Sequence, residues 1–173
     1  KIEDIDYILC GSEEEAMLLE ASLIKQNKPK YNVSLRDDKS FPVIKITQEP
    51  FPAVFIGRPK KNDHALYIGP FTNATLLRRL LKKIRRIFPF CICRPMPKKP
   101  CLDYHLKLCP APMLGEISKA DYARTISDIR IFLEGKFDKL LRRLNQRMLS
   151  FAAKQQFEEA VRVRNQIKAL SSL

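Results

Sequence analysis

Four of the five cysteines stand close together in the middle of the chain, at positions 91, 93, 101 and 109. Thiols at this density, in a basic chain with an odd cysteine count, favour metal or cluster ligation over disulfides. Because soft sulfur suits zinc and iron–sulfur clusters, Cys91, Cys93, Cys101 and Cys109 are candidate ligands. The alternative is that they are scattered structural cysteines. His105, between the last two, is either a zinc ligand or a surface residue.

A carboxylate within an apolar pattern marks a second candidate site. Residues 12–27 are expected to form a helix, with Ser12 as N-cap and Glu15 reaching back to the Ser12 amide. At about 100° per residue, Glu20 falls near the middle of an apolar arc of this helix. A buried carboxylate needs compensation, either from a nearby Lys or Arg or from a bound Mg²⁺ or Mn²⁺. The arc consists of Ala16, Met17, Leu19, Leu23 and Ile24.

A third candidate site is a one-sided set of cations on a helix predicted over residues 73–88. The formal net charge of the chain is +13, which makes a polyanion the expected partner. Nucleic acid is favoured over a membrane surface because the basic residues do not form one terminal cluster. Arg36 and Lys39 are weaker candidates, and the alternative is a merely solvated amphipathic helix. The helix carries Arg78, Arg79, Lys82, Lys83, Arg85 and Arg86.

The last stretch, residues 137–170, has the apolar spacing of two consecutive helices. A hairpin of two helices leaves one apolar side uncovered, so it needs a partner. The alternative is an ordinary C-terminal hairpin that packs on its own domain.

The remaining patterns predict an α+β fold. Residues 5–10 read as a short strand, and 43–47, 53–58 and 65–69 as a small antiparallel β-meander joined by Pro- and Asn-rich turns. A further helix is expected from the Ser118 cap to about Gly135. We divide the chain at 1–37, 38–90, 91–115, 116–135 and 136–173. No apolar run approaches the roughly 20 residues needed to span a bilayer, so we expect no membrane partner and a cytoplasmic location.

Several ordered motifs resemble the UvrC family. They are Ala16-Met17-Leu18-Leu19-Glu20, Pro29-Lys30-Tyr31-Asn32-Val33, Leu35-Arg36-Asp37-Asp38-Lys39, Pro100-Cys101-Leu102-Asp103 and Cys109-Pro110-Ala111-Pro112. The resemblance implies the C-terminal part of a GIY-YIG nuclease domain, in which Glu20 binds the divalent metal and Asn32 supports the site. It also implies a [4Fe–4S] cluster at Cys93 or Cys91, Cys101 and Cys109. The fourth ligand position is Met113, and this departure puts the cluster in question.

The C-terminal hairpin resembles the UVR motif shared by UvrB and UvrC. The resemblance implies that Phe157 is the apolar anchor for UvrB, with Glu158, Glu159 and Arg164 setting the register by charge. The triplet Tyr67-Ile68-Gly69 is not the YIG of the nuclease, because in the family that strand precedes the glutamate helix. No GIY triplet occurs in the sequence, so we expect the chain as given not to cut DNA.

The function implied by the resemblance is a subunit of the nucleotide-excision-repair endonuclease, which incises damaged duplex DNA after recruitment by UvrB. One alternative is a non-catalytic adaptor that keeps the partner hairpin and the DNA surface. Another is a metal-stabilised nucleic-acid-binding module.

Overall fold

The structure is a computed structural model, which describes residues 4–30, 41–60, 63–94, 96–97 and 99–173. It contains a three-stranded sheet and six α-helices among these residues, so the fold is α+β as predicted. The strands are β1 Val43–Ile46, β2 Val54–Gly57 and β3 Leu66–Ile68. The helices are α1 Glu13–Asn27, α2 Ala74–Ile87, α3 Leu102–His105, α4 Lys119–Leu133, α5 Phe137–Ala153 and α6 Phe157–Leu170.

The sheet is antiparallel, but its strand order is β2-β1-β3, so the predicted meander order is wrong. Ile44 of β1 lies opposite Ile56 on one side and Ile68 on the other. All four residues of β1 are buried, which explains why this strand takes the central position. The outer edge of β2 is partly used as well, because the Val54 amide donates to the Cys91 carbonyl at 3.0 Å.

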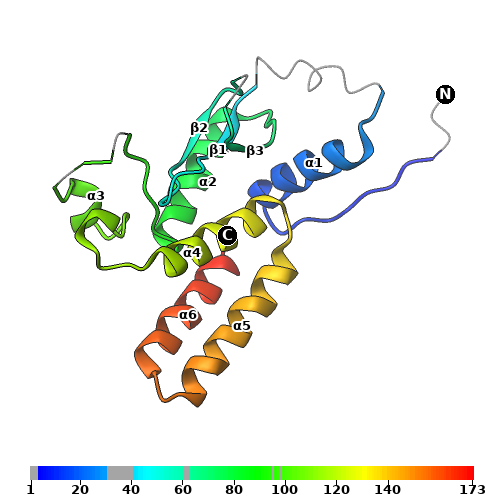
Figure 1. Cartoon of the computed structure of the whole chain (residues 1–173). Helices are drawn as coiled ribbons and strands as arrows, with labels where there is room; N and C mark the ends of the chain where they lie inside the picture. Colours follow the sequence, from blue (N-terminus) through cyan, green and yellow to red (C-terminus); the bar gives the residue numbers. More distant parts are fainter. Residues whose placement is uncertain (1–3, 31–40, 61–62, 95, 98) are drawn as a thin grey trace.

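Helix α2 lies against the sheet (Figure 1) and supplies much of the core. Asn73 is its N-cap and accepts a hydrogen bond from the Leu76 amide at 2.9 Å. Apolar residues at helical spacing fill the buried side, which leaves the cations on the solvent side. The buried residues of α2 are Leu76, Leu77, Leu80, Ile84 and Ile87.

The strand predicted over residues 5–10 is wrong. This segment has no regular secondary structure and pairs with none of the described strands. Its apolar side chains are solvent-exposed, including Ile5, Tyr7 and Leu9. A β-type sequence alone cannot form a strand, because the ladder hydrogen bonds and the buried face both come from a neighbour.

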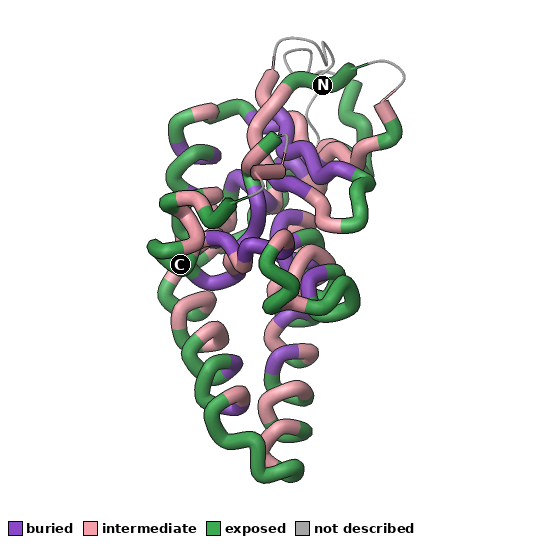
Figure 2. Tube along the Cα trace, turned by 60° about the vertical axis from the view of Figure 1, so that its left-hand side comes forward, coloured by how far each residue is buried: buried purple, intermediate pink, exposed green. Residues whose placement is uncertain are grey.

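Helices α4, α5 and α6 continue the core below the sheet (Figure 1). Ser118 caps α4 as predicted, by accepting from the Asp121 amide at 3.0 Å. The buried carboxylate of Asp128 on α4 pairs with two guanidinium groups on α5, Arg147 at 2.8 Å and Arg143 at 3.3 Å. Figure 2 shows that buried residues gather where the α5–α6 hairpin meets the rest, while its far end is exposed.

Candidate functional site

Glu20 lies on the solvent side of α1, so the prediction that it sits in a buried apolar face is wrong. The buried residues of this helix are Met17, Leu18 and Ala21. The packed face is centred on Leu18 and Ala21, more than a third of a turn from Glu20. Sequence spacing could not locate that face, because α1 carries apolar residues on several sides.

The surroundings of Glu20 contain little to neutralise it. The Thr72 hydroxyl donates to its Oε2 at 3.5 Å, and no ion pair joins Glu20 to any Lys or Arg that the structure describes. An exposed carboxylate with a weak neutral partner has free oxygen lone pairs. Its donor chemistry therefore fits a hard divalent ion that takes its other ligands from water and phosphate. Asn32, the supporting residue, lies outside the described residues.

The Ser12 cap of α1 holds as predicted, but the second half of the capping box differs. Ser12 Oγ accepts from the Glu15 amide at 3.1 Å. The Glu15 carboxylate accepts instead from the amide of Gly11, at 2.7 Å, one residue before the predicted donor.

The cations of α2 divide into two groups. Lys83 pairs with Glu14 of α1, and this ion pair lowers the pKa of the Glu14 carboxyl. Arg85 pairs with Asp103 at 2.9 Å. These two cations hold α2 to other parts of the fold. The other four make no ion pair with a described carboxylate, and all are exposed: Arg78, Arg79, Lys82 and Arg86. Arg36 and Lys39 lie outside the described residues.

Arg85 joins the basic helix to the cysteine segment. Its Nε donates to the Phe90 carbonyl at 3.1 Å, and its guanidinium lies 5.6 Å from the centre of the Phe90 ring. Because Asp103 is also its ion-pair partner, the Arg85 side chain is used in structural contacts within the protein. The sequence did not separate Arg85 from its neighbours, because the partners are distant along the chain.

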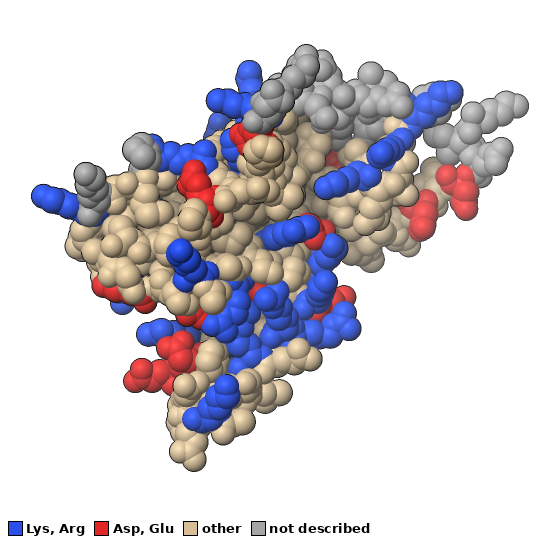
Figure 3. Space-filling model, viewed as in Figure 1, with Lys and Arg blue, Asp and Glu red and all other residues tan. Residues whose placement is uncertain are grey.

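A second cationic area lies over α4 and the beginning of α5 on the face drawn in Figure 3. Its charges are largely paired within the chain. Glu134 pairs with Arg130 at 2.7 Å and Lys136 at 2.6 Å, and Asp128 pairs with Arg143 and Arg147. Positive charge on this area is therefore less available to a polyanion than that of α2.

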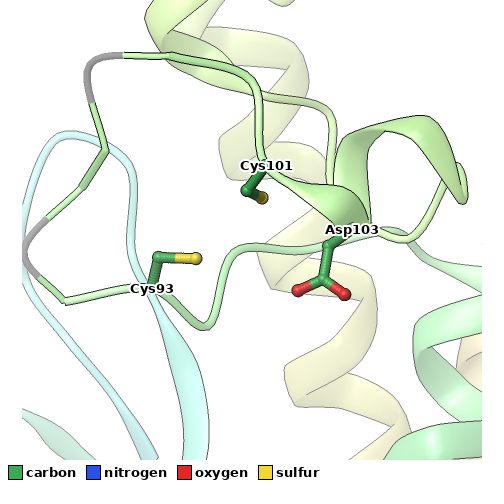
Figure 4. Close-up of side chains that lie close together, drawn as sticks. All are labelled: Cys93, Cys101 and Asp103. Atoms are coloured by element: carbon green, nitrogen blue, oxygen red, sulfur yellow. The ribbon is translucent and has the colours of Figure 1, made fainter.

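The four clustered cysteines form two neighbouring pairs. The Sγ atoms of Cys91 and Cys109 are 3.2 Å apart and buried. Cys93 and Cys101 lie with Asp103, and their ligand atoms are all within 4.8 Å of one another (Figure 4). This is the one group of three or more potential ligands found among the described residues. The sequence missed Asp103, although its position two residues after Cys101, in the first turn of α3, was a usable signal.

The thiols influence each other electrostatically. Hydrogen bonding from Cys91 lowers the pKa of Cys109 to about 6, and the nearby Arg85 charge acts in the same direction. The same hydrogen bond, together with burial, raises the pKa of Cys91. Burial and the neighbouring Cys101 raise the pKa of Cys93, and the Cys109 charge adds to that rise. The group formed by Cys93, Cys101 and Asp103 includes neither Cys91 nor Cys109, so the buried pair lies beside that group and not within it.

The buried pair is anchored by Tyr122. Its hydroxyl accepts from the Cys91 amide at 3.0 Å and donates to the Pro52 carbonyl at 2.7 Å. The two thiols and the carboxylate of Cys93, Cys101 and Asp103 suit a soft metal ion, and the neighbouring Cys91–Cys109 pair supplies the further thiols that an iron–sulfur cluster needs. His105 belongs to no such group, and its ring packs against Tyr104 with centroids 5.4 Å apart.

The C-terminal hairpin packs on its own domain at one end and leaves apolar side chains uncovered at the other. Near the sheet it packs on its own domain, where the Gln166 amide donates to the Ile87 carbonyl at 3.0 Å. Near the α5–α6 turn its apolar side chains are uncovered, with Phe157 63% and Leu149 64% exposed. Val161, one turn after Phe157, is exposed too.

The charged residues predicted to set partner register differ in their surroundings. Glu158 and Arg164 are exposed, without an ion pair to any described residue. Glu159 is half-buried and pairs with Arg162 of the same helix at 2.9 Å.

No helix in the described part of the chain has both the length and the apolar content to cross a membrane.

Comparison with known proteins matches three family models along the chain. The UvrC-like GIY-YIG domain matches residues 1–33, the UvrC/Cho excinuclease middle domain residues 41–132, and the UvrB/uvrC motif residues 138–173. No solved structure matches.

Curated relatives match over nearly the whole chain. The UvrABC system protein C of Moorella thermoacetica is 42% identical over 99% of this chain, and that of Carboxydothermus hydrogenoformans 41% over 100%. The chain spans 29% of the length of each of these relatives. In Chlorobium phaeobacteroides the protein of the same name is 43% identical over 98% of the chain and 28% of its own length. The middle-domain model covers more than half of the chain, and the chain therefore belongs to the UvrC family.

Proposed function

We propose that this chain is part of a nucleotide-excision-repair subunit that incises damaged DNA, and that α2 contacts the DNA backbone. The supporting observation is the set of four exposed, unpaired cations on α2: Arg78, Arg79, Lys82 and Arg86. Contacts to phosphate position a protein on DNA without reading its sequence. Such contacts suit a repair protein that acts wherever a lesion occurs.

The test is binding of the chain to labelled duplex DNA, measured by fluorescence anisotropy across a salt series. A variant with Gln at Arg78, Arg79, Lys82 and Arg86 should bind more weakly. Its slope of log affinity against log salt should fall by about 3.6, since each of the four lost phosphate contacts removes roughly 0.9.

The matched control carries Gln at four exposed cations of the α5–α6 hairpin, namely Lys139, Arg142, Lys154 and Lys168. It loses the same net charge, so any effect of overall charge appears in both variants. Equal losses in the two variants would contradict a contact surface on α2.

Glu20 is proposed as a ligand of the divalent ion at the nuclease site. Its exposure and weak Thr72 partner leave carboxylate oxygens available, and Mg²⁺ commonly binds one or two carboxylates together with substrate phosphates. The ion would polarise the scissile phosphate. The role of Glu20 is to hold that ion, and Asn32 would support the site.

The corresponding experiment uses a full-length family protein that contains this chain. Glu20→Gln keeps the size of the side chain but removes the charge that binds a cation. One of the incisions should be lost while DNA affinity is unchanged. Cutting at both sides of the lesion at the parent rate would refute the assignment.

We further propose that the exposed end of the hairpin binds UvrB. Two apolar side chains one turn apart, Phe157 and Val161, are presented to solvent beside the exposed Glu158 and Arg164. Uncovered apolar groups of this kind are the usual anchors of helix-pair interfaces. Phe157→Ser with Val161→Ser should abolish binding to UvrB in calorimetry. Leu102→Ser with Leu106→Ser, equally exposed on and beside α3, is the control, and loss of binding in both would argue against a specific site.

The cysteine site is proposed to hold a soft metal or an iron–sulfur cluster through Cys91, Cys93, Cys101 and Cys109. Such a group would cross-link the segments before and after α3. Residue 113 is methionine and lies in the short 3-10 turn Pro112–Leu114, so the buried Cys91 is the available fourth thiol. Anaerobically prepared protein should retain iron or zinc by elemental analysis, and Cys101→Ser should release it. Metal-free protein in which all five cysteine thiols titrate would exclude the proposal.

A further inference from the structure

A cavity of about 740 Å³ lies between strand β2 and helix α2. Its wall on the helix side contains Arg78, Lys82 and Arg86, which are four residues apart and therefore form a row along one side of α2. Successive members of the row are about 6 Å apart along the helix axis. None of the three makes an ion pair with a described carboxylate.

The rest of the cavity is apolar and partly aromatic. Phe55 of β2, the buried Phe90 and the partly exposed Ile92 contribute to its lining, and the lining contains no acidic residue. Two more guanidinium groups line the cavity, but each has a carboxylate partner: Arg85 pairs with Asp103 and Arg94 with Glu49. The unpaired charge therefore lies on α2.

A DNA duplex would not fill an apolar cavity of this size, because its phosphates lie on the outside of a wide double helix. A single strand presents both a regular row of phosphates and unstacked bases. Grooves that bind single strands combine cations that follow the backbone with aromatic side chains on which bases stack. The lining of this cavity has both components, in a volume typical of small-ligand sites.

The Phe55 side chain leaves β2 on the face opposite to Val54 and Ile56, which pack in the core with α2, so its ring lies at the rim of the cavity. The Arg94 guanidinium lies 4.9 Å from the ring centre, and Ile56, the next residue along β2, lies opposite Ile44 of the central strand. Arg94 also lines the cavity, so a planar group at the rim would meet the guanidinium plane beside this ring, and both are surfaces on which bases stack.

We propose that the groove between β2 and α2 binds an unpaired stretch of a DNA strand, with phosphates on Arg78, Lys82 and Arg86 and a base beside Phe55. This inference rests on the proposed DNA contact of α2 and deepens it, because it assigns single-stranded DNA to one side of that helix. Arg79 does not line the cavity, and its proposed contact is with the flanking duplex.

The experiment compares binding of the chain to a 12-nucleotide single strand, to a duplex, and to poly-glutamate. Each ligand is followed by fluorescence anisotropy, and a strand containing 2-aminopurine reports stacking of the base. The single strand should bind at least tenfold more tightly than poly-glutamate. Gln at Arg78, Lys82 and Arg86 should lower the single-strand salt slope by about 2, at roughly 0.7 per contact.

Phe55→Leu separates stacking from charge, because it keeps an apolar side chain and changes no charge. Single-strand affinity should fall about tenfold, the scale of one lost stacked base, with duplex affinity unchanged. Ile92→Ser, at a site 41% exposed, is a second variant that removes apolar lining without opening the core. Thermal melts of both variants establish that they fold.

The outcomes are distinguishable. If the triple Gln variant weakens duplex and single strand equally and neither Phe55→Leu nor Ile92→Ser has an effect, the groove assignment is overturned while the DNA contact of α2 stands. If no nucleic acid binds at all, the proposed function fails as well. Tighter binding of poly-glutamate than of DNA would show that the groove takes an acidic protein segment.

Discussion

Removing Arg147 should destabilise the protein more than neutralising Asp128, although both changes break the same ion pair. Asp128 is fully buried on α4, whereas the side chains of Arg147 and Arg143 on α5 are 22% and 36% exposed. A guanidinium that loses its partner here can turn toward water. The Asp128 carboxylate cannot, so the cost depends on which partner remains.

The magnitudes follow from what each variant leaves behind. Arg147→Met leaves the buried carboxylate with Arg143 alone, at 3.3 Å. Loss of one partner of a buried pair costs about 3–5 kcal/mol, and the remaining Arg143 reduces this to roughly 2–4 kcal/mol. Asp128→Asn keeps the side-chain shape and an acceptor oxygen, so we expect a cost of about 1–2 kcal/mol. Arg143→Met with Arg147→Met should reach the upper end of the buried-pair range.

The measurement is urea unfolding followed by far-ultraviolet circular dichroism, with the free energy of unfolding extrapolated to water. Arg142→Met is the matched control, because Arg142 is exposed and, among the described residues, donates only to the Asp138 carbonyl of its own helix at 3.3 Å. Its effect should stay within about 0.5 kcal/mol. A cost for Asp128→Asn equal to or larger than that for Arg147→Met would refute the reasoning.

Two further predictions concern the sheet. Gly69→Ala should lower the free energy of unfolding by about 1–3 kcal/mol, because Gly69 has φ +117° and an added Cβ would lie 2.9 Å from the Phe71 ring; an unchanged urea midpoint would contradict this. Hydrogen bonding from Lys45 lowers the pKa of Asp63 from 3.8 to about 2. Because the folded pKa is below the ordinary value, this pair stabilises the fold above about pH 4 and its contribution is lost as the pH falls toward 2. Carboxyl-carbon NMR should give a midpoint near 2 for Asp63, and one near 4 in the parent protein would disprove the interaction.

The sequence by itself determined the local elements of this protein. The caps at Ser12, Asn73 and Ser118, the amphipathic stripe of α2 and the α5–α6 hairpin all depend on side chains within a few residues of one another. Interactions of this range are encoded in spacing. The order of motifs was also sufficient to indicate the family. The location of the cysteines in one region followed from their density along the chain.

Only the tertiary structure decided which faces are buried and which charges are free. Glu20 is exposed because α1 packs through Leu18 and Ala21, and residues 5–10 form no strand because they have no described neighbour to pair with. Arg85 and Lys83 are occupied by Asp103 and Glu14, whose positions are far from them in sequence. The same holds for the split of the cysteines into two pairs and for the groove beside Phe55. These features depend on contacts between distant segments, and the spacing of residues within one segment does not encode such contacts.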